Sequence, residues 1–140
     1  MMADSLSSER RSWNMSRIKG RNTNPEVRLR SLLHRAGFRF RLHAKDLPGR
    51  PDVVLPKYRT AIFVHGCFWH RHPGCRNATT PSTRPEFWQQ KFQSNVIRDA
   101  RNRTELEAAG WKVKTVWECE LKTDAEGVIS HLAGELRKAD

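Results

Sequence analysis

Two of the chain's three cysteines lie close together in sequence, among three histidines. Cys67, His72 and Cys75 follow the spacing Cys-x4-His-x2-Cys, and Cys119 lies far downstream. Three thiolates and one imidazole match a closed tetrahedral zinc site, and such a saturated, thiolate-rich shell predicts a structural ion. His70 competes with His72 for the imidazole position. The alternative is that the cysteines are free and buried as small hydrophobic residues.

A second set of residues could hydrolyse a phosphodiester. That reaction needs a divalent cation at the phosphate, an activated water and a proton for the leaving oxygen. Asp52 begins an apolar run after a segment rich in glycine and proline, and it is the candidate metal ligand. His65 and His70 offer imidazoles suited to general acid or base work. A turn-capping aspartate and two structural histidines are the alternative.

The charge balance points to a polyanionic partner. The chain has 26 basic and 15 acidic residues and a formal net charge of +11. Most of the basic residues are arginines, whose planar guanidinium suits phosphates and guanine edges. They are spread over the whole sequence, which argues against a simple basic tail. We therefore expect nucleic-acid binding. A basic solvated surface or association with ribosomes is the alternative.

The cysteine count and the apolar runs indicate in which cellular compartment the protein is found. Three cysteines cannot all be paired, and an odd number suits a reducing cytosol and metal binding. The first residues contain no apolar core of a secretory signal. No apolar run approaches the roughly 20 residues that cross a bilayer. We expect a soluble cytoplasmic protein.

A length of 140 residues predicts one domain with a real core. Residues 1–22 are polar, basic and rich in serine, and we expect a flexible arm followed by a domain over 23–140. The first firm helix is predicted from Asn24, a good N-cap, with Pro25 at the first helical position and Glu26 near the positive end of the helix dipole. Gly37 is the expected stop.

The remaining elements alternate between strand and helix patterns. Strands are predicted at Phe38–Leu42, Asp52–Leu55, Arg59–Val64 and Trp111–Trp117, with a hairpin turn at Pro56–Tyr58 and a long loop over 66–84. Two capping boxes predict helix starts, Thr83 with Glu86 for a helix to about Ala109, and Thr123 with Glu126 for the last helix. The class is therefore α/β.

Several motifs together resemble one family, the Vsr very-short-patch-repair DNA mismatch endonucleases, over roughly residues 11 to 121. The resemblance implies a restriction-endonuclease-like, PD-(D/E)xK-related fold, with a mixed central sheet flanked by helices and a structural zinc loop. The motifs are Asn14–Met15, Asn22–Thr23 with Glu26, Leu47–Asp52, His65–His70, Arg84–Trp88, Asn95 with Asp99, and Val116–Cys119.

The resemblance also implies an activity. Members nick one strand 5′ to the thymine of a T·G mismatch that arises by deamination of 5-methylcytosine, in a magnesium-dependent reaction. By this resemblance, Asp52 and the Val64 carbonyl are magnesium ligands, and Glu26 binds through metal-bound water. His65 and His70 are the catalytic histidines, and Asp99 is the partner of a histidine. The implied zinc ligands are Cys67, His72, Cys75 and Cys119.

Aromatic residues and the arm are implied to read the DNA. Phe68, Trp69 and Trp88 correspond to residues that wedge beside the mismatch, where a duplex is easiest to unstack. Met15 and Ile18 resemble a groove-inserting pair. Packing in the core, for the aromatics, and packing of a first helical turn on the body, for the arm, are the alternatives.

Two departures from the family pattern stand out. Val64 occupies a position where members carry threonine, so a carbonyl ligand survives but a hydroxyl contact is lost. The Pro73–Gly74 insertion before Cys75 is longer than in some relatives.

The expected partner is double-stranded DNA with a T·G mismatch, bound by a monomer associated with the bacterial nucleoid. Recruitment of other mismatch-repair factors stays open. Two alternatives remain: a nuclease of the same fold with another target, and a zinc-stabilised DNA-binding module without activity.

Overall fold

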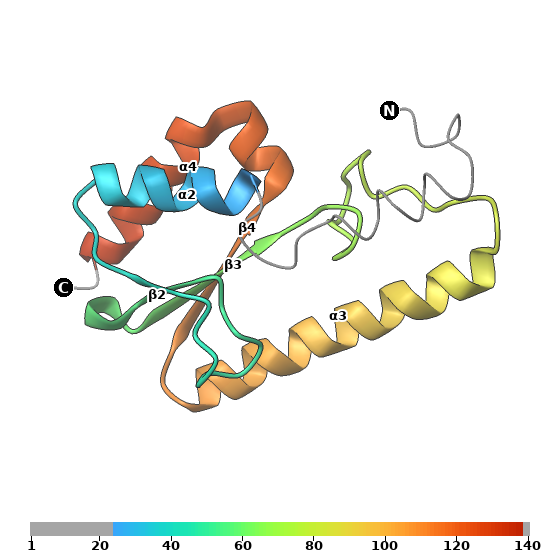
Figure 1. Cartoon of the computed structure of the whole chain (residues 1–140), viewed down its shortest axis with the longest axis horizontal. Helices are drawn as coiled ribbons and strands as arrows, with labels where there is room; N and C mark the ends of the chain where they lie inside the picture. The colour runs from blue at the N-terminus through green and yellow to red at the C-terminus, as the bar shows by residue number, and fades with distance from the viewer. Residues whose placement is uncertain (1–23, 139–140) are drawn as a thin grey trace.

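The computed structural model describes residues 24–138, in which a mixed four-stranded sheet is covered by helices on both faces (Figure 1). In spatial order the strands are β1 (Arg41–Leu42), β2 (Val53–Leu55), β3 (Thr60–His65) and β4 (Lys112–Trp117). The first three are antiparallel neighbours, and β3 and β4 run parallel. The helices are α2 (Asn24–Arg35), α3 (Pro85–Ala108) and α4 (Glu118–Lys138).

The sheet separates two hydrophobic clusters. Ile62 and Val64 of β3 pack with the apolar sides of α2 and α4, which lie together on one face of the sheet. Ala61 and Phe63 pack instead with Leu106 of α3 on the other face. Because side chains alternate along a strand, His65 continues the α3-facing row. This alternation brings His65 to the same side of the sheet as α3.

Several predicted elements are confirmed. The helix from Asn24 is α2, and Gly37 follows it with a φ of 91°, as expected for a stop in the left-handed region. The strands β2, β3 and β4 lie within two residues of their predicted bounds. The predicted hairpin turn is a single 3-10 turn at Pro56–Tyr58, and Arg59 after it has a φ of 50°. The 66–84 loop contains no helix or strand.

The predicted strand at Phe38–Leu42 is wrong in length, since β1 has only two residues. Arg41 lies opposite Val54 and Leu42 opposite Val53, so the same register would place Arg39 opposite Pro56. Proline has no N–H to donate to a neighbouring strand, which stops the pairing there. Phe38 packs in the core of the α2 and α4 side instead.

The first capping box is also wrong. α3 begins at Pro85, and Arg84 before it lies in the left-handed region with a φ of 53° and makes no side-chain cap. A cap at Thr83 would require Arg84 to be helical. A residue before proline avoids the helical region because it clashes with the proline ring, so Pro85 itself becomes the first helical residue.

The predicted last helix is the second of two segments of α4, which follows a kink at Asp124, and a further helical segment that was not predicted precedes it. α4 begins at Glu118 directly after β4, and its first turn ends at a kink where Asp124 has non-helical dihedral angles. The Glu120 carboxylate accepts the Trp117 N–H at 3.0 Å, and the Asp124 carboxylate accepts the Gly127 N–H at 3.0 Å. Asp124, one residue after the predicted Thr123, therefore caps the second segment, and Glu120 bonds back to the residue that precedes the first segment. Among the described residues no helix is both long and apolar enough to span a membrane.

Candidate active site and metal clusters

The ends of β2 and β3 bring the first candidate residues together. Asp52 immediately precedes β2, and Val64 and His65 end β3 beside it. The Asp52 Oδ2 atom accepts the Val64 backbone N–H at 2.7 Å. In an extended strand the N–H and C=O of one residue point to the same side. The Val64 carbonyl therefore faces the same edge as the Asp52 carboxylate.

Glu26 from α2 and His43 from the segment after β1 complete a cluster around Asp52. One ligand atom from each of the three side chains lies within 4.8 Å of the other two. Burial raises the pKa of Asp52 from 3.8 to about 6; the Val64 hydrogen bond opposes this shift and the nearby Glu26 adds to it. Two carboxylates held close together away from water are what a hard divalent cation needs. The cluster therefore fits a magnesium-like ion.

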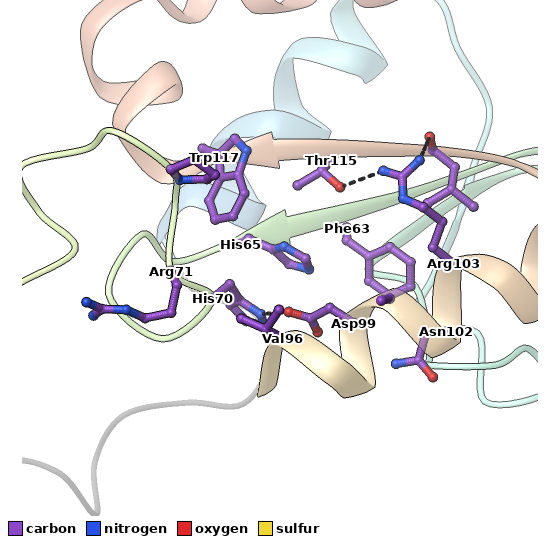
Figure 2. A pocket seen from close by; sticks show the side chains of 13 residues that line it. Phe63, His65, His70, Arg71, Val96, Asp99, Asn102, Arg103, Thr115 and Trp117 are labelled. Atoms are coloured by element: carbon purple, nitrogen blue, oxygen red, sulfur yellow. Dashed lines mark hydrogen bonds and ion pairs between the residues drawn. The ribbon is translucent and has the colours of Figure 1, made fainter. Parts of the chain in front are cut away.

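The two candidate histidines form a stacked pair next to this cluster. The ring centroids of His65 and His70 are 3.9 Å apart and the rings are nearly parallel, at 5°. His70 Nδ1 lies 2.6 Å from Asp99 Oδ2, so a residue of the loop meets a residue of α3, as Figure 2 shows. Burial, with a smaller effect of His70, lowers the pKa of His65 to about 4. His65 is therefore neutral at physiological pH.

Both groups, apart from His43, line one cleft of about 760 Å³. Glu26, Asp52, His65, His70 and Asp99 all line it. Its other lining residues include three arginines, Arg50, Arg98 and Arg101. The histidine pair also borders a second cavity of about 310 Å³ between β3, β4 and α3, which Figure 2 shows. An open cleft with carboxylates at its centre and arginines around it suits a phosphodiester and a cation.

Cys67, His72, Cys75 and Cys119 form a separate cluster, with one ligand atom of each within 4.8 Å of the others. His72 Nδ1 is 3.6 Å from Cys67 Sγ and 3.4 Å from Cys119 Sγ. Zinc–sulfur and zinc–nitrogen bonds of about 2.3 and 2.0 Å give a tetrahedral edge of about 3.5 Å. The donor set therefore fits a tetrahedral metal ion, and His72 rather than His70 belongs to it.

Burial raises the pKa of the Cys67 thiol to about 12. A metal cation would oppose this effect, because it binds the thiolate. Cys119 lies in the first turn of α4, two residues after β4 ends, whereas the sequence suggested a place at the end of the last strand. The cluster therefore ties the loop to the junction of β4 and α4.

The Arg71 side chain connects separate parts of the 66–84 loop through hydrogen bonds. Its guanidinium donates to the carbonyls of Phe68, Ala78 and Thr79 at 3.3, 2.9 and 2.9 Å, and to the Thr80 hydroxyl at 3.1 Å. It also stacks over the Phe92 ring, 4.0 Å from the centroid. These contacts connect the two ends of the loop to α3.

The candidate aromatic residues form one cluster that borders the cleft through Phe68 and Trp69. Phe68 contacts Trp69, Trp88 and Phe92 with ring centroids 5.0, 5.7 and 5.1 Å apart. Phe92 is buried, whereas Phe68, Trp69 and Trp88 are each partly exposed. Phe68 and Trp69 line the cleft. The cluster therefore rests on the buried Phe92 ring and presents partly exposed rings that a nucleobase could reach.

Sequence reasoning missed three residues of this region: His43, Arg71 and Glu118. Glu118 Oε1 accepts the Cys67 N–H at 3.2 Å and lines the cleft. The signal for Glu118 was its position beside Cys119, and that for Arg71 was its place between His70 and His72. His43 carried no signal, because it is distant in sequence from the other candidates. Met15 and Ile18 lie outside the described residues.

Solved structures contain a related fold. The catalytic domain of the homing endonuclease I-Bth0305I aligns with a TM-score of 0.59 and 22% sequence identity, over 84% of this chain and 98% of that domain. At this level of identity the likeness concerns the fold alone. It agrees with the expected fold class, a nuclease-type mixed sheet flanked by helices.

Sequence comparisons identify the family. The profile described as DNA mismatch endonuclease Vsr matches residues 3–77. The type II nicking enzyme V.XorIIP of Xanthomonas oryzae pv. oryzae is 52% identical over 120 residues, which cover 86% of this chain and 88% of that protein. The DNA mismatch endonuclease Vsr of Escherichia coli is 49% identical over 121 residues, which cover 86% of this chain and 77% of that protein. Together with the clustered carboxylates and histidines, these matches show that the chain belongs to the Vsr family of DNA mismatch endonucleases.

Proposed function

We propose that this endonuclease nicks one strand of duplex DNA on the 5′ side of the thymine in a T·G mismatch, in a magnesium-dependent hydrolysis. The observation that carries the proposal is the meeting, in one arginine-lined cleft, of the Asp52 cluster with the His70–Asp99 pair. A cation site and a proton-transfer group must both reach the same phosphate for hydrolysis. Relatives named as mismatch endonuclease and nicking enzymes support the choice of DNA and of a single cut.

Asp52 and the Val64 carbonyl would hold magnesium directly, and Glu26 would act through a water bound to the ion. When bound, magnesium supplies a Lewis acid at the phosphate and lowers the pKa of a coordinated water. The geometry that supports this assignment is the 2.7 Å hydrogen bond from Val64 to Asp52, which fixes the carboxylate beside the strand edge. Because a backbone carbonyl serves as the second ligand, valine at this position can replace the family's threonine.

The histidine pair would move the proton. In the hydrolysis the water oxygen bonds to phosphorus, the bond from phosphorus to the leaving oxygen breaks, and one proton passes from the water to the leaving oxygen. Nδ1 of His70 is hydrogen-bonded to the Asp99 carboxylate, so Nε2 is the ring nitrogen left for this proton transfer. His65, neutral and stacked on His70, supports the ring and borders the same cleft.

The thiolate cluster would hold one structural zinc ion. Its four protein donors fill a tetrahedral shell, which leaves no position for substrate, so its contribution is to the loop and not to the chemistry. The loop carries His70 and the aromatic residues. A zinc ion at this place would therefore fix both the catalytic histidine and the candidate wedge, Phe68, Trp69 and Trp88.

Duplexes of identical sequence that carry T·G or T·A at one position test the proposal. Each would be labelled on one strand and incubated with the full-length protein, with and without magnesium. We expect a single nick in the T·G duplex that requires magnesium and is lost in Asp52→Ala. Cleavage of both duplexes at equal rates would instead favour a nuclease of the same fold with another target, and mismatch binding without any cleavage would favour a binding module. Varying the flanking bases would identify the sequence context.

A further inference from the structure

His43 is the third member of the Asp52 cluster, and the roles proposed above leave it unused. Its Nε2 atom lies 3.0 Å from Glu26 Oε2, and both side chains are largely buried, with 18% and 6% of their surfaces exposed. Its backbone N–H donates to the Asp52 carbonyl oxygen at 3.1 Å. One residue is thus connected to both carboxylate residues of the cluster, to Glu26 by its ring and to Asp52 by its backbone.

The backbone of His43 adopts an uncommon conformation to make these contacts. Its φ is 47°, in the left-handed region, which is uncommon for residues other than glycine, although histidine adopts it more often than most side chains do. Such a conformation costs on the order of 1–3 kcal/mol and persists only where the surroundings enforce it. Here it lies directly after β1, and the N–H groups of His43 and Ala44 continue the pairing, to the Asp52 and Pro51 carbonyls. The N–H bond to Asp52 and the ring contact with Glu26 together hold this conformation.

We propose that His43 is a positioning residue that holds the Glu26 carboxylate toward Asp52 for binding of the divalent cation. This inference rests on the proposed function of the cleft. The ring donates its Nε2–H to Glu26 Oε2 and so fixes the orientation in which the carboxylate meets a water on the ion. Without this donor, the Glu26 carboxylate would be held less firmly beside Asp52, because two neighbouring carboxylates repel each other when no cation lies between them.

The chemistry of the donors favours this role over direct ligation by His43. Magnesium takes oxygen ligands and keeps several waters, and an imidazole nitrogen is a poor ligand for it. In metal sites the groups that hydrogen-bond to ligands orient them, and their loss typically weakens metal affinity about 10- to 100-fold. The Glu26–His43 contact has this form, a buried donor fixed on a carboxylate.

Two substitutions test whether a donor at the position of His43 Nε2 is needed, separately from the left-handed backbone at this residue. In His43→Asn the residue tolerates the left-handed conformation, but its amide nitrogen matches the position of Nδ1 and falls short of Glu26. In His43→Gln the amide nitrogen matches the position of Nε2 and retains the donor. His131→Asn is the matched control, because His131 also contacts a glutamate, Glu135, at 2.9 Å, but on the surface with 78% exposure.

The experiment measures magnesium affinity of the full-length protein by titration calorimetry, without DNA, together with thermal unfolding of each variant. We expect His43→Asn to weaken binding about 10-fold, His43→Gln to restore most of it and His131→Asn to change nothing. In the Glu26→Gln background His43→Asn should cause no further loss, because its effect passes through Glu26.

Several results would overturn the inference: equal affinity of His43→Asn and the parent, equal losses in the Asn and Gln variants, additive losses with Glu26→Gln, or no magnesium binding by the parent. Because the readout needs no cleavage, failure of this inference can be told apart from failure of the proposed T·G nicking. A parent that nicks T·G duplexes while His43→Asn binds magnesium normally would reject only the role of His43.

Discussion

The imidazoles of His65 and His70 stack with their centroids 3.9 Å apart, and Asp99 contacts His70 at 2.6 Å. Burial keeps His65 neutral, with its pKa lowered to about 4. Stacking of a neutral ring on His70 restricts its rotation, and the carboxylate fixes its tautomer. We therefore expect the two residues to differ in role despite their similar position, with His65 supporting the ring of His70 and His70 carrying the proton.

This difference predicts the effect of removing the carboxylate. Asp99→Asn should slow nicking by on the order of 10²-fold, within the range of general acid or base catalysis, because His70 loses its fixed tautomer. Affinity for the T·G duplex without magnesium should stay unchanged. Single-turnover nicking and duplex binding would be measured side by side. Asp46→Asn is the control, since Asp46 makes an exposed ion pair with Arg41. Equal single-turnover rates for Asp99→Asn and the parent would remove Asp99 from the mechanism.

A second prediction concerns stability and pH. The Asp52 pKa is raised from 3.8 to about 6 in the folded chain. Between these values the folded state binds more protons than the unfolded state, so the free energy of unfolding falls as pH rises through this window and stays lower above it. Asp52→Asn removes the charge. Without magnesium at pH 7.5 it should therefore be more stable than the parent by up to about 3 kcal/mol.

Urea unfolding in magnesium-free buffer at pH 7.5 and at pH 5 checks this prediction. The advantage of Asp52→Asn should shrink at the lower pH, where the parent carboxylate takes up a proton. Addition of magnesium should stabilise the parent and not the variant, while nicking by the variant is lost. If Asp52→Asn is less stable than the parent at both pH values, the carboxylate is not strained by burial and its structural contacts dominate.

The sequence predicted the strands and helices that local patterns determine. β2, β3, β4 and α2 follow from alternation and from the Asn24–Pro25 start, and their order agrees with the fold. The failures have local physical causes. Pro85 kept Arg84 out of the helical region and displaced the predicted cap, and the absent N–H of Pro56 shortened β1. Neither effect is visible in a pattern of apolar residues.

Only some residues of the site could be predicted from patterns in the sequence. Cys67, His72 and Cys75 share a local spacing that is typical of a metal site, and they cluster with Cys119. The clustering of Asp52 with Glu26, and of His70 with Asp99, depends on how α2 and α3 pack on the sheet. Asp52 and His70 were predicted from their residue types and places in the sequence, whereas only the family resemblance named Glu26 and Asp99 as site residues in advance. His43 needs both the β1 register and a left-handed backbone to reach Glu26, so no pattern in the sequence indicated it.

The thiolate cluster predicts one tightly held zinc ion per chain. Cys119→Ser should lose zinc and lower the melting temperature, because Cys119 connects the loop to the start of α4. Elemental analysis and thermal unfolding of the purified protein would measure both effects. His34→Ser is the control, since His34 lies on α2 outside the cluster. A purified parent protein without bound zinc would contradict the assignment of the ion.

The contacts of Arg71 predict that this side chain holds the 66–84 loop against α3. Arg71→Lys keeps the charge but loses most of the planar donors that reach Phe68, Ala78 and Thr79. We expect faster hydrogen exchange over residues 76–84 and a stability loss of about 1–3 kcal/mol. Arg76→Lys is the control, because Arg76 is exposed in the same loop. Exchange rates that are equal in Arg71→Lys and Arg76→Lys would show that the loop does not depend on this guanidinium.

The aromatic cluster predicts how mismatch preference separates from general affinity. General affinity should come from phosphate contacts of the basic surface and fall steeply with salt, whereas phosphate contacts carry no sequence information. Trp69 and Trp88 are partly exposed, with ring centroids 5.8 Å apart, above the buried Phe92. Base–aromatic stacking is worth about 1–3 kcal/mol per base. Trp69→Ala and Trp88→Ala should therefore each reduce the T·G over T·A binding ratio about 10- to 100-fold and leave the salt slope nearly unchanged.

Binding of both duplexes across a salt series, for the parent and each variant, measures the ratio and the slope together. Trp111→Leu is the control, because Trp111 precedes β4 at the end of the sheet away from His65. Thermal unfolding separates a lost wedge from a damaged core. Equal weakening of both duplexes, together with a lowered melting temperature, would mean that the tryptophans pack the fold and that the preference for T·G arises elsewhere. A reduced ratio with an unchanged melting temperature assigns the preference to stacking on the aromatic cluster that borders the cleft.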